Sequence, residues 1–315
     1  MIRTALIGCG GRGRGQLRVL SEFDDVELVA VCDPLAEARA QAADEHGIER
    51  RYESIEKMLD DGNIDAIFVT TPAHLNASSA LPCLQAGVAT LLEKPPGLHI
   101  EQTHQLREAA EKSGAKAMVG WDRRFHPLIV EARRLVEERG PIVQLVGEFH
   151  KGMANLERGG RFPEIMMQRM LLETPIHSID IVRSLGNSDV AEVHSVVKRR
   201  FSKYNDVHAA LVLFENGCVA HIIANYTTSA RLERYEIHGR EISAYLEGVH
   251  TAKIVCNEET RELKKGEGSS SHGENRFFID CVKHDRPIDL PAANLDEAVK
   301  TMELCEAILA GLRED

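Results

Sequence analysis

Glycines crowd the turn that follows the first apolar run of this 315-residue chain, and such clusters commonly bind phosphate groups. The stretch MIRTALIGCGGRGRGQLRVL places Gly8, Gly10 and Gly13 in the spacing G-x-G-x-x-G. In a nucleotide-binding loop the first glycine permits a tight turn, the second lets the backbone approach a pyrophosphate, and the third lets a helix lie close to a strand. Arg12 within this pattern would either assist the phosphates or lie in solvent. The spacing arises by chance often enough that its context must support it.

The surrounding sequence supports a dinucleotide site. Residues 2–7 read as a buried strand, and an apolar pattern at residues 17–20 predicts a helix directly after the glycines. A second strand, VELVAVCD, ends in Asp33, about 20 residues beyond Gly13, the usual spacing for a carboxylate that binds an adenosine ribose. Because an ionised Asp33 would accept from a 2′-hydroxyl and repel a 2′-phosphate, we expect NAD rather than NADP.

Two further stretches follow predicted strands, where ligands collect in open α/β sheets. VTTPAH follows the strand near residues 64–70, and LLEKPP closes the strand near residues 88–92. Thr71, Pro72, His74, Glu93 and Lys94 should therefore line the crevice for a nicotinamide. Lys94 is either a surface side chain whose ammonium reaches solvent or a cation aimed into the site.

The segment ETPIHSID, residues 173–180, could supply a general base. Thr174 as N-cap and Pro175 as the first helical residue would begin a helix with His177 in its first turn and Asp180 one turn later. The positive end of a helix disfavours a protonated imidazole, and a neutral imidazole can accept the proton of a hydroxyl. Alternatively, His177 and Asp180 only tie the helix to a sheet.

Alternating strands and helices must position these residues. Strands near 2–7, 26–32, 64–70, 88–92 and 116–119, with helices between them, predict a doubly wound parallel sheet. A helix within 120–142 passes to a second half with strand-like segments, starting with IVQLVGEFH, joined by turns such as FENGC. This half reads as an α/β domain with an open, mostly antiparallel sheet, a helical insert at 164–186 and a packing helix after Asn294. We expect a loop at 264–274, and domains at 1–121 and 122–315.

Composition excludes several classes of function. The net charge of −11 and the lack of a long basic run argue against a nucleic-acid partner. Without a signal-like N-terminus or an apolar run of about 18 residues, secretion and membrane insertion are not expected, and we predict a cytoplasmic protein. The seven scattered cysteines read as reduced core residues, and the fourteen histidines show no metal-ligand spacing, so no metal is expected.

The glycine pattern, TTPAH, EKP and an acid-x-x-x-His-x-x-Asp helix start, in this order, resemble the glucose-fructose oxidoreductase / inositol dehydrogenase / MocA family over essentially the whole chain. The resemblance implies a Rossmann domain, a second domain whose open sheet forms a homodimer or homotetramer, and NAD(P)-dependent hydride transfer at a hydroxyl-bearing carbon of a sugar or polyol. It further implies that Lys94 binds the reacting oxygen, that His177 accepts the proton and that Glu173 supports it, in place of the family's aspartate.

These expectations give two sets of site residues. The cofactor should contact Gly8, Gly10, Gly11, Arg12, Gly13, Asp33, Thr70, Thr71, Pro72, His74, Glu93 and Lys94. The substrate should contact Lys94, Arg161, Glu173, His177 and Asp180, with the segment 151–169 forming part of the pocket. Two rival functions remain open, a glycosidase that uses NAD transiently and a non-catalytic sensor of a dinucleotide or sugar.

Overall fold

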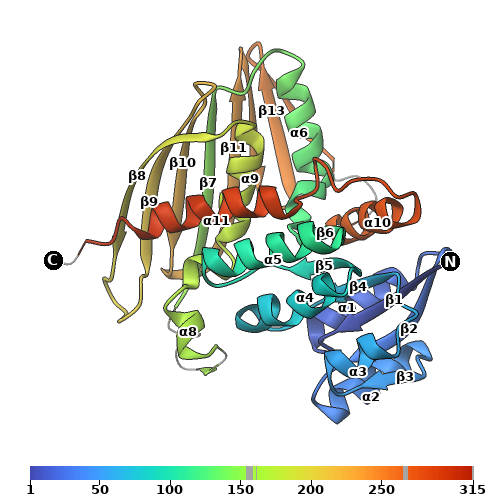
Figure 1. Cartoon of the computed structure of the whole chain (residues 1–315). Coiled ribbons are helices and arrows are strands. Elements are labelled where there is room, and N and C mark those ends of the chain that lie inside the picture. Colours follow the sequence, from blue (N-terminus) through green and yellow to red (C-terminus); the bar gives the residue numbers. More distant parts are fainter. Residues whose placement is uncertain (154–158, 161, 265–268, 314–315) are drawn as a thin grey trace. The chain divides into compact units, whose positions relative to one another are not determined.

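The computed structural model describes residues 1–153, 159–160, 162–264 and 269–313 (Figure 1). The chain divides into two compact units. The first comprises Met1–Asp122 and Ser269–Val299, and the second comprises Arg123–Gly268 and Lys300–Asp315. The units differ from the predicted domains chiefly in the segment 269–299, which packs with the first unit.

The first unit is built on a six-stranded sheet in the order β3-β2-β1-β4-β5-β6, and every adjacent pair is parallel. Strands β4, β5 and β6 are largely apolar and buried along their length, as expected of a sheet covered on both faces. The predicted strands are confirmed, but the short edge strand β3 was not predicted. The strands are β1 (Ile2–Ile7), β2 (Val26–Cys32), β3 (Arg50–Tyr52), β4 (Ala66–Val69), β5 (Ala89–Glu93) and β6 (Ala117–Gly120).

Two groups of helices accompany this sheet. Helices α1, α2 and α10 form one series of contacts, and α3, α4 and α5 form another. Their bounds are α1 (Gly11–Leu20), α2 (Ala36–His46), α3 (Ile55–Asp60), η1 (Ala73–Leu75), α4 (Asn76–Gln85), α5 (Ile100–Ser113) and α10 (Ser270–Lys283).

Helix α10 corrects the prediction of a loop at 264–274. The Ser269 side chain accepts from the backbone N–H of His272 at 3.1 Å, so the helix is capped and begins at Ser270. Residues 265–268 lie outside the described residues. The ring of Phe278 meets the ring of Phe68 edge to face, with centroids 5.4 Å apart, which is why this late segment belongs to the first unit.

The second unit is built on an eight-stranded sheet in the order β14-β13-β12-β11-β7-β10-β9-β8. All adjacent pairs are antiparallel except β7 and β10, which confirms the predicted, mostly antiparallel sheet. The strands are β7 (Gln144–Gly152), β8 (Val190–Lys198), β9 (Val207–Phe214), β10 (Val219–Asn225), β11 (Thr227–Gly239), β12 (Ile242–Glu247), β13 (Thr251–Cys256) and β14 (Glu259–Leu263).

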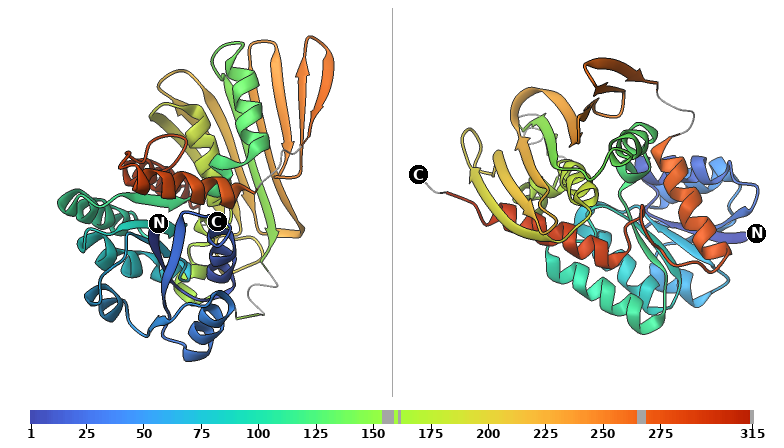
Figure 2. Two further views of the ribbon diagram at one scale, coloured as in Figure 1. Left: turned by 90° about the vertical axis from the view of Figure 1, so that its right-hand side faces the viewer. Right: turned by 90° about the horizontal axis from the view of Figure 1, so that it is seen from above.

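Helices lie along one face of this sheet (Figure 2). Helix α9 packs on β7, β10 and β11, and α6 packs on β11, β12 and β13. Gly147 on β7 allows the close approach of α9, because an added Cβ would lie 2.7 Å from a methyl group of Val182. The helical elements are η2 (Asp122–Phe125), α6 (Pro127–Glu137), α8 (Glu164–Met167), η3 (Met170–Leu172), α9 (Ile176–Gly186) and α11 (Leu295–Leu309). No helix among the described residues is long and apolar enough to cross a membrane.

Candidate functional site

The glycine loop of the first unit depends on glycine at two positions for close backbone packing. Gly8 follows β1 with φ +93°, and an added Cβ there would lie 2.8 Å from the carbonyl carbon and oxygen of Thr70. An added Cβ on Gly13 would overlap the carbonyl oxygen of Gly8 and lie 2.8 Å from the Thr70 hydroxyl oxygen. These contacts match the turn and the close helix–strand packing expected of a dinucleotide loop.

The outer side of the same loop is open. An added Cβ on Gly10, Gly11 or Gly15 would meet no atom within 4 Å. Helix α1 begins at Gly11 with no side-chain cap and no acidic residue in its first turn. The first backbone N–H groups of a helix lack partners within the helix and carry a partial positive charge. This loop therefore fits a pyrophosphate in its shape and in its donors.

Asp33 lies beside the loop at the end of β2. One carboxylate oxygen accepts from the backbone N–H of Cys9 at 2.7 Å, and the other accepts from that of Leu35 at 2.8 Å. These two bonds fix the carboxylate and leave each oxygen a second lone pair. The arrangement fits the hydroxyl groups of an adenosine ribose.

A buried asparagine, which sequence reasoning missed, joins the two other predicted loops. The Asn76 side chain donates to the carbonyl oxygens of Glu93 and Pro95 at 2.9 and 3.0 Å, and it accepts from the Thr71 hydroxyl at 3.0 Å. Asn76 has no exposed surface, and it begins α4 directly after the turn of TTPAH. The TTPAH and EKP loops are therefore held together by one side chain.

Among the other residues in these loops, one supports the glycine loop and several are exposed or half-buried. The Thr70 hydroxyl donates to the carbonyl oxygen of Gly8 at 2.7 Å, so it braces the glycine loop. Pro72 is exposed and His74 is half-buried, at the short helix η1. Lys94 is half-buried and precedes a cis peptide bond to Pro95.

The Arg12 side chain points to Glu93. The sequence instead predicts that Arg12 contacts the phosphates of the cofactor. Its guanidinium forms an ion pair with the Glu93 carboxylate, which is only 7% exposed. Burial lowers the pKa of Arg12, but the charge and hydrogen bond of Glu93 outweigh this effect and raise it. The side chain of Gln16 also donates to Glu93, at 3.5 Å, and accepts from Asn275 of α10 at 2.6 Å. Sequence reasoning missed Gln16 and Asn275 because they come together only in the fold.

The start of α9 in the second unit carries the predicted base. His177 is 8% exposed, and its backbone N–H donates to the carbonyl oxygen of Thr174 at 3.1 Å. The expected N-cap is not present, because the Thr174 hydroxyl instead donates to the Glu173 carboxylate and the helix begins at Ile176. Lys151 of β7, the first residue of the segment 151–169 that was predicted to form part of the pocket, lies with its ammonium 3.1 Å from the same carboxylate. Lys151 and Thr174 thus both contact the Glu173 carboxylate.

Asp180 has a different position from the one predicted for a substrate contact. Its carboxylate is buried and forms a two-bond pair with Arg124, with N–O distances of 2.8 and 2.7 Å. Thr301 of α11 donates to the same carboxylate at 2.9 Å. Because this carboxylate has no exposed surface and accepts three hydrogen bonds, its observed contacts fit a role in holding α9 in place, and a substrate contact stays a prediction.

Three remaining expectations concern the insert, metals and cysteines. Arg161 lies outside the described residues, and Arg169 pairs with Glu306. Among the residues that the structure describes, no three metal-ligating side chains come together as a possible metal site. All seven cysteines are free thiols, and six of them are buried.

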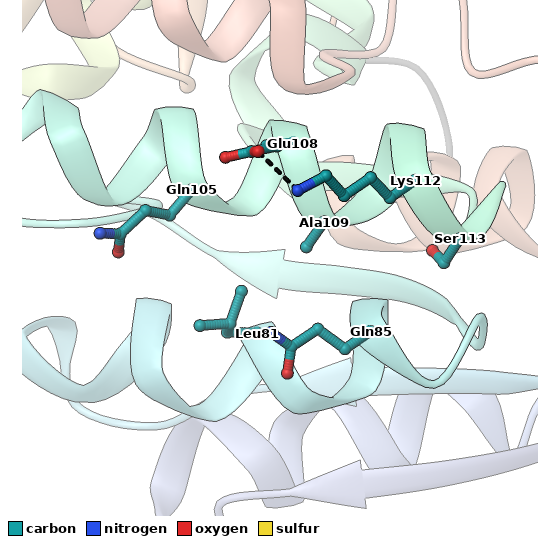
Figure 3. Close-up of a pocket in the computed structure, with 7 residues that line it drawn as sticks. All are labelled: Leu81, Gln85, Gln105, Glu108, Ala109, Lys112 and Ser113. Atoms are coloured by element: carbon teal, nitrogen blue, oxygen red, sulfur yellow. Dashed lines mark hydrogen bonds and ion pairs between the residues drawn. The ribbon is translucent and has the colours of Figure 1, made fainter.

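A surface hollow of about 310 Å³ lies between α4 and α5 of the first unit (Figure 3). Leu81 and Gln85 line it from α4, and the Glu108–Lys112 pair, 2.6 Å apart, lies on α5. None of its lining residues belongs to the predicted sites.

Comparisons with known proteins match both halves of the chain. A model described as the oxidoreductase family with an NAD-binding Rossmann fold matches residues 2–121, and a GFO/IDH/MocA C-terminal domain model matches residues 129–245. A scyllo-inositol 2-dehydrogenase (NAD(+)) of Bacillus subtilis is 27% identical over 255 residues, covering 78% of this chain and 73% of that protein. A D-apiose dehydrogenase of Paraburkholderia graminis is 27% identical over 340 residues, covering 99% and 88%. The solved UDP-N-acetylglucosamine 3-dehydrogenase of Acidithiobacillus ferrooxidans shares the fold, with a TM-score of 0.85, 21% identity and coverage of 99% and 97%.

Proposed function

Because the chain belongs to the GFO/IDH/MocA family of NAD-binding oxidoreductases, we propose that it is a dehydrogenase that oxidises a hydroxyl-bearing carbon of a sugar, a polyol or a derivative. NAD, when bound, supplies the acceptor for the hydride. The observation that carries the proposal is the set of three loops in the first unit. Thr70 braces the glycine loop, and Asn76 joins the TTPAH loop to the backbone on both sides of Lys94.

Lys94 is the proposed donor to the reacting oxygen. An ammonium beside a hydroxyl stabilises the negative charge that develops as the hydroxyl proton leaves. The Arg12–Glu93 pair and the Asn76 clamp fix the segment that presents Lys94.

His177 is the proposed proton acceptor in the second unit. A neutral imidazole near pH 7 can take a hydroxyl proton, and its place in the first turn of α9 favours the neutral form. Glu173 lies one turn earlier, and the Lys151 ammonium fixes its carboxylate. We propose that this pair orients His177 and balances the charge that His177 gains.

Asp33 favours NAD over NADP in this proposal. Its fixed carboxylate accepts from hydroxyl groups and repels a 2′-phosphate. An Asp33→Ala variant should therefore lose affinity for NAD while the discrimination against NADP weakens.

A spectrophotometric screen tests the function. The purified protein is mixed with NAD or NADP and a panel of sugars, polyols, sugar acids and aryl glycosides, and NADH is followed at 340 nm. We expect NADH with at least one substrate. Lys94→Ala and His177→Ala should each lower kcat by about a hundredfold or more with little change in NAD affinity. The control Lys112→Ala, on the exposed face of α5, should retain full activity.

Two outcomes would contradict the proposal. Cleavage of a glycoside without net NADH would indicate a glycosidase that uses NAD transiently. Tight NAD binding with no turnover of any compound would indicate a sensor.

We also propose that the second unit forms a homodimer or homotetramer through the sheet face opposite α9. This face carries half-buried Val146, Leu211 and Ile223, and Val196 is 48% exposed. Such an apolar face is typical of an interface between subunits. Val196→Glu should shift the mass measured by light scattering toward the monomer.

The free cysteines support a reducing, cytoplasmic location.

A further inference from the structure

Strand β11 loses its regular pairing with β7 opposite Lys151. Thr227 pairs with Gly152 and Leu232 pairs with His150, so the four residues 228–231 lie opposite Lys151 alone. Bulges of this kind redirect side chains and are frequent beside active sites. This bulge ends at Arg231.

Arg231 lies on the sheet face that α9 covers. Its guanidinium is 5.2 Å from the ring centroid of Phe149, which is buried. Side chains two residues apart on a strand share a face, so Phe149 and Lys151 point to the same side of β7. Arg231 and Lys151 are therefore neighbouring cations on one face.

Arg231 is a second cation on a carboxylate that already has one. Arg123 donates to both oxygens of Glu233, at 2.8 and 3.2 Å, while Arg231 donates at 2.9 Å. Burial raises the pKa of Glu233, but the bonds from Arg123, Tyr235 and Arg231 outweigh this and lower it to about 2. The Arg123 side chain is 13% exposed, whereas that of Arg231 is 56% exposed. Of the two cations on this carboxylate, Arg231 is therefore the one whose guanidinium faces outward.

Hydrogen bonds connect this group to the start of α9. The phenol of Tyr235 donates to Glu233 at 2.8 Å. Ser178, the residue after His177, lies near enough to this phenol to affect its pKa. On the other side of His177, Lys151 contacts Glu173 and Thr174.

The charges of this group give a local positive excess. Among the described residues, the ion pairs of this group join the three cations Arg123, Arg231 and Lys151 to the two carboxylates Glu173 and Glu233. The whole chain, in contrast, carries a net charge of −11. A positive excess beside the proposed base is therefore opposite in sign to the rest of the protein.

We propose that the substrate of this enzyme carries an oxyanion group, a carboxylate or a phosphate, and that Arg231 binds it. This inference rests on the proposed function, because it places the substrate at His177. The planar guanidinium matches both anions with two parallel hydrogen bonds, and its contacts with Phe149 and Glu233 hold it in place before the ligand arrives. The chemistry predicts a sugar acid or a sugar phosphate rather than a neutral polyol.

Calorimetric binding in the presence of NAD tests the inference without requiring turnover. The probes are matched sets of a hexose, its hexuronate and its 6-phosphate in the gluco, galacto and manno configurations. We expect a hexuronate or a phosphate to bind at least about tenfold more tightly than its neutral hexose. Arg231→Ala should remove this preference, and Arg231→Lys should restore part of it. The control Arg240→Ala removes one exposed positive charge just beyond the other end of β11 and should leave the preference unchanged.

The hexuronate and 6-phosphate probes distinguish a carboxylate from a phosphate. Because binding is measured without turnover, the experiment also tests anion binding by Arg231 separately from the proposed dehydrogenase function. Preference for the hexuronate identifies a carboxylate, and preference for the 6-phosphate identifies a phosphate. The inference would be overturned if the charged and neutral probes bound with equal affinity. It would also be overturned if Arg231→Ala and Arg240→Ala weakened the binding of the charged probe equally. An Arg231-dependent preference without NADH formation would support this inference while the proposed dehydrogenase function fails.

Discussion

The glycine loop of the first unit and the start of α9 in the second are built in different ways. The loop is shaped by main-chain contacts, with Gly13 against Gly8 and donors from the first turn of α1. The start of α9 is shaped by charged side chains from separate strands, with Lys151 on Glu173 and Arg124 on Asp180. A main-chain site needs particular residues only where atoms come close, whereas a side-chain site needs every partner in place.

This difference predicts how each region responds to substitution. The loop should be sensitive at a few glycines and tolerant at the others. The α9 region should lose stability when one partner of a buried pair is removed.

The largest expected effect on ligand binding is the loss of NAD affinity in Gly13→Ala. The new methyl group would overlap the Gly8 carbonyl oxygen, so α1 must move away from the loop. We expect NAD affinity to fall by at least about a hundredfold, equivalent to about 3 kcal/mol, as measured by titration calorimetry. Gly15→Ala lies on the same helix with open space around its Cβ and should bind NAD normally. Equal affinities in the two variants would show that main-chain packing does not define the loop.

Asp180→Ala tests the side-chain region. Removing the carboxylate leaves the Arg124 guanidinium buried without its counter-charge, which costs about 3–5 kcal/mol in the free energy of unfolding from urea denaturation. Asp189→Ala removes an exposed carboxylate that pairs with Lys300, and it should not change stability measurably. If Asp180→Asn folds with wild-type stability but loses substrate affinity, Asp180 contacts the substrate after all.

The second unit should also be sensitive to acid through His208 on β9. Burial lowers the pKa of His208 from 6.5 to about 4. The unfolded chain therefore binds a proton between these values while the folded chain does not, and stability falls as the pH drops from 6.5 to 4. The loss from this group is about 3 kcal/mol.

The measurement is urea denaturation at pH 7 and pH 4.5. His208→Gln should lose less stability between these values than the wild type, and His221→Gln, exposed on β10, should match the wild type. In the first unit, burial raises the pKa of Cys9 and Cys83 to about 12, so these thiols stay neutral throughout this range. If His208→Gln lost as much stability between pH 7 and pH 4.5 as the wild type, groups other than His208 would be responsible for the acid sensitivity.

The smallest expected effect is that of Asn76→Ala, which tests a side-chain clamp in the loop region. The variant loses two donated bonds and one accepted bond at buried groups, a cost of about 1–3 kcal/mol. We expect kcat to fall about tenfold because Lys94 is less well positioned, with NAD affinity nearly unchanged. Ser78→Ala, on the exposed side of α4, is the matched control. A fall in NAD affinity with kcat unchanged would mean that the clamp serves the cofactor and not Lys94.

Local sequence patterns were sufficient to predict most of the first unit. The apolar runs gave β1, β2, β4, β5 and β6, and the glycine spacing gave the loop, because both signals involve residues close in sequence. The edge strand β3 has only three residues, with sequence RRY, and carries no apolar alternation. Helix α10 begins in a segment rich in serine and glycine, so its first turn looked like a loop.

The partners of the site side chains could not be predicted. Arg12 and Glu93 are 81 residues apart, and Arg123 and Glu233 are 110 residues apart. Sequence spacing contains no information about such pairs, so Arg12 looked like a phosphate ligand and Asp180 like a substrate ligand. Arg231 was missed for the same reason, and Lys151 was predicted only as part of the pocket segment 151–169, since a single cation on a strand has no recognisable pattern.

The discontinuity of the first unit has a consequence for biosynthesis. The ribosome completes Met1–Asp122 before it adds about 150 further residues and then α10, a delay of roughly 7–30 s. During that interval the nascent sheet lacks the cover that Phe278 gives to Phe68, and Asp25 lacks the ion pair with Arg276. A premature stop anywhere before α10 would thus release a nucleotide-binding half with exposed apolar surface, which is a substrate for chaperones and proteases rather than a working domain.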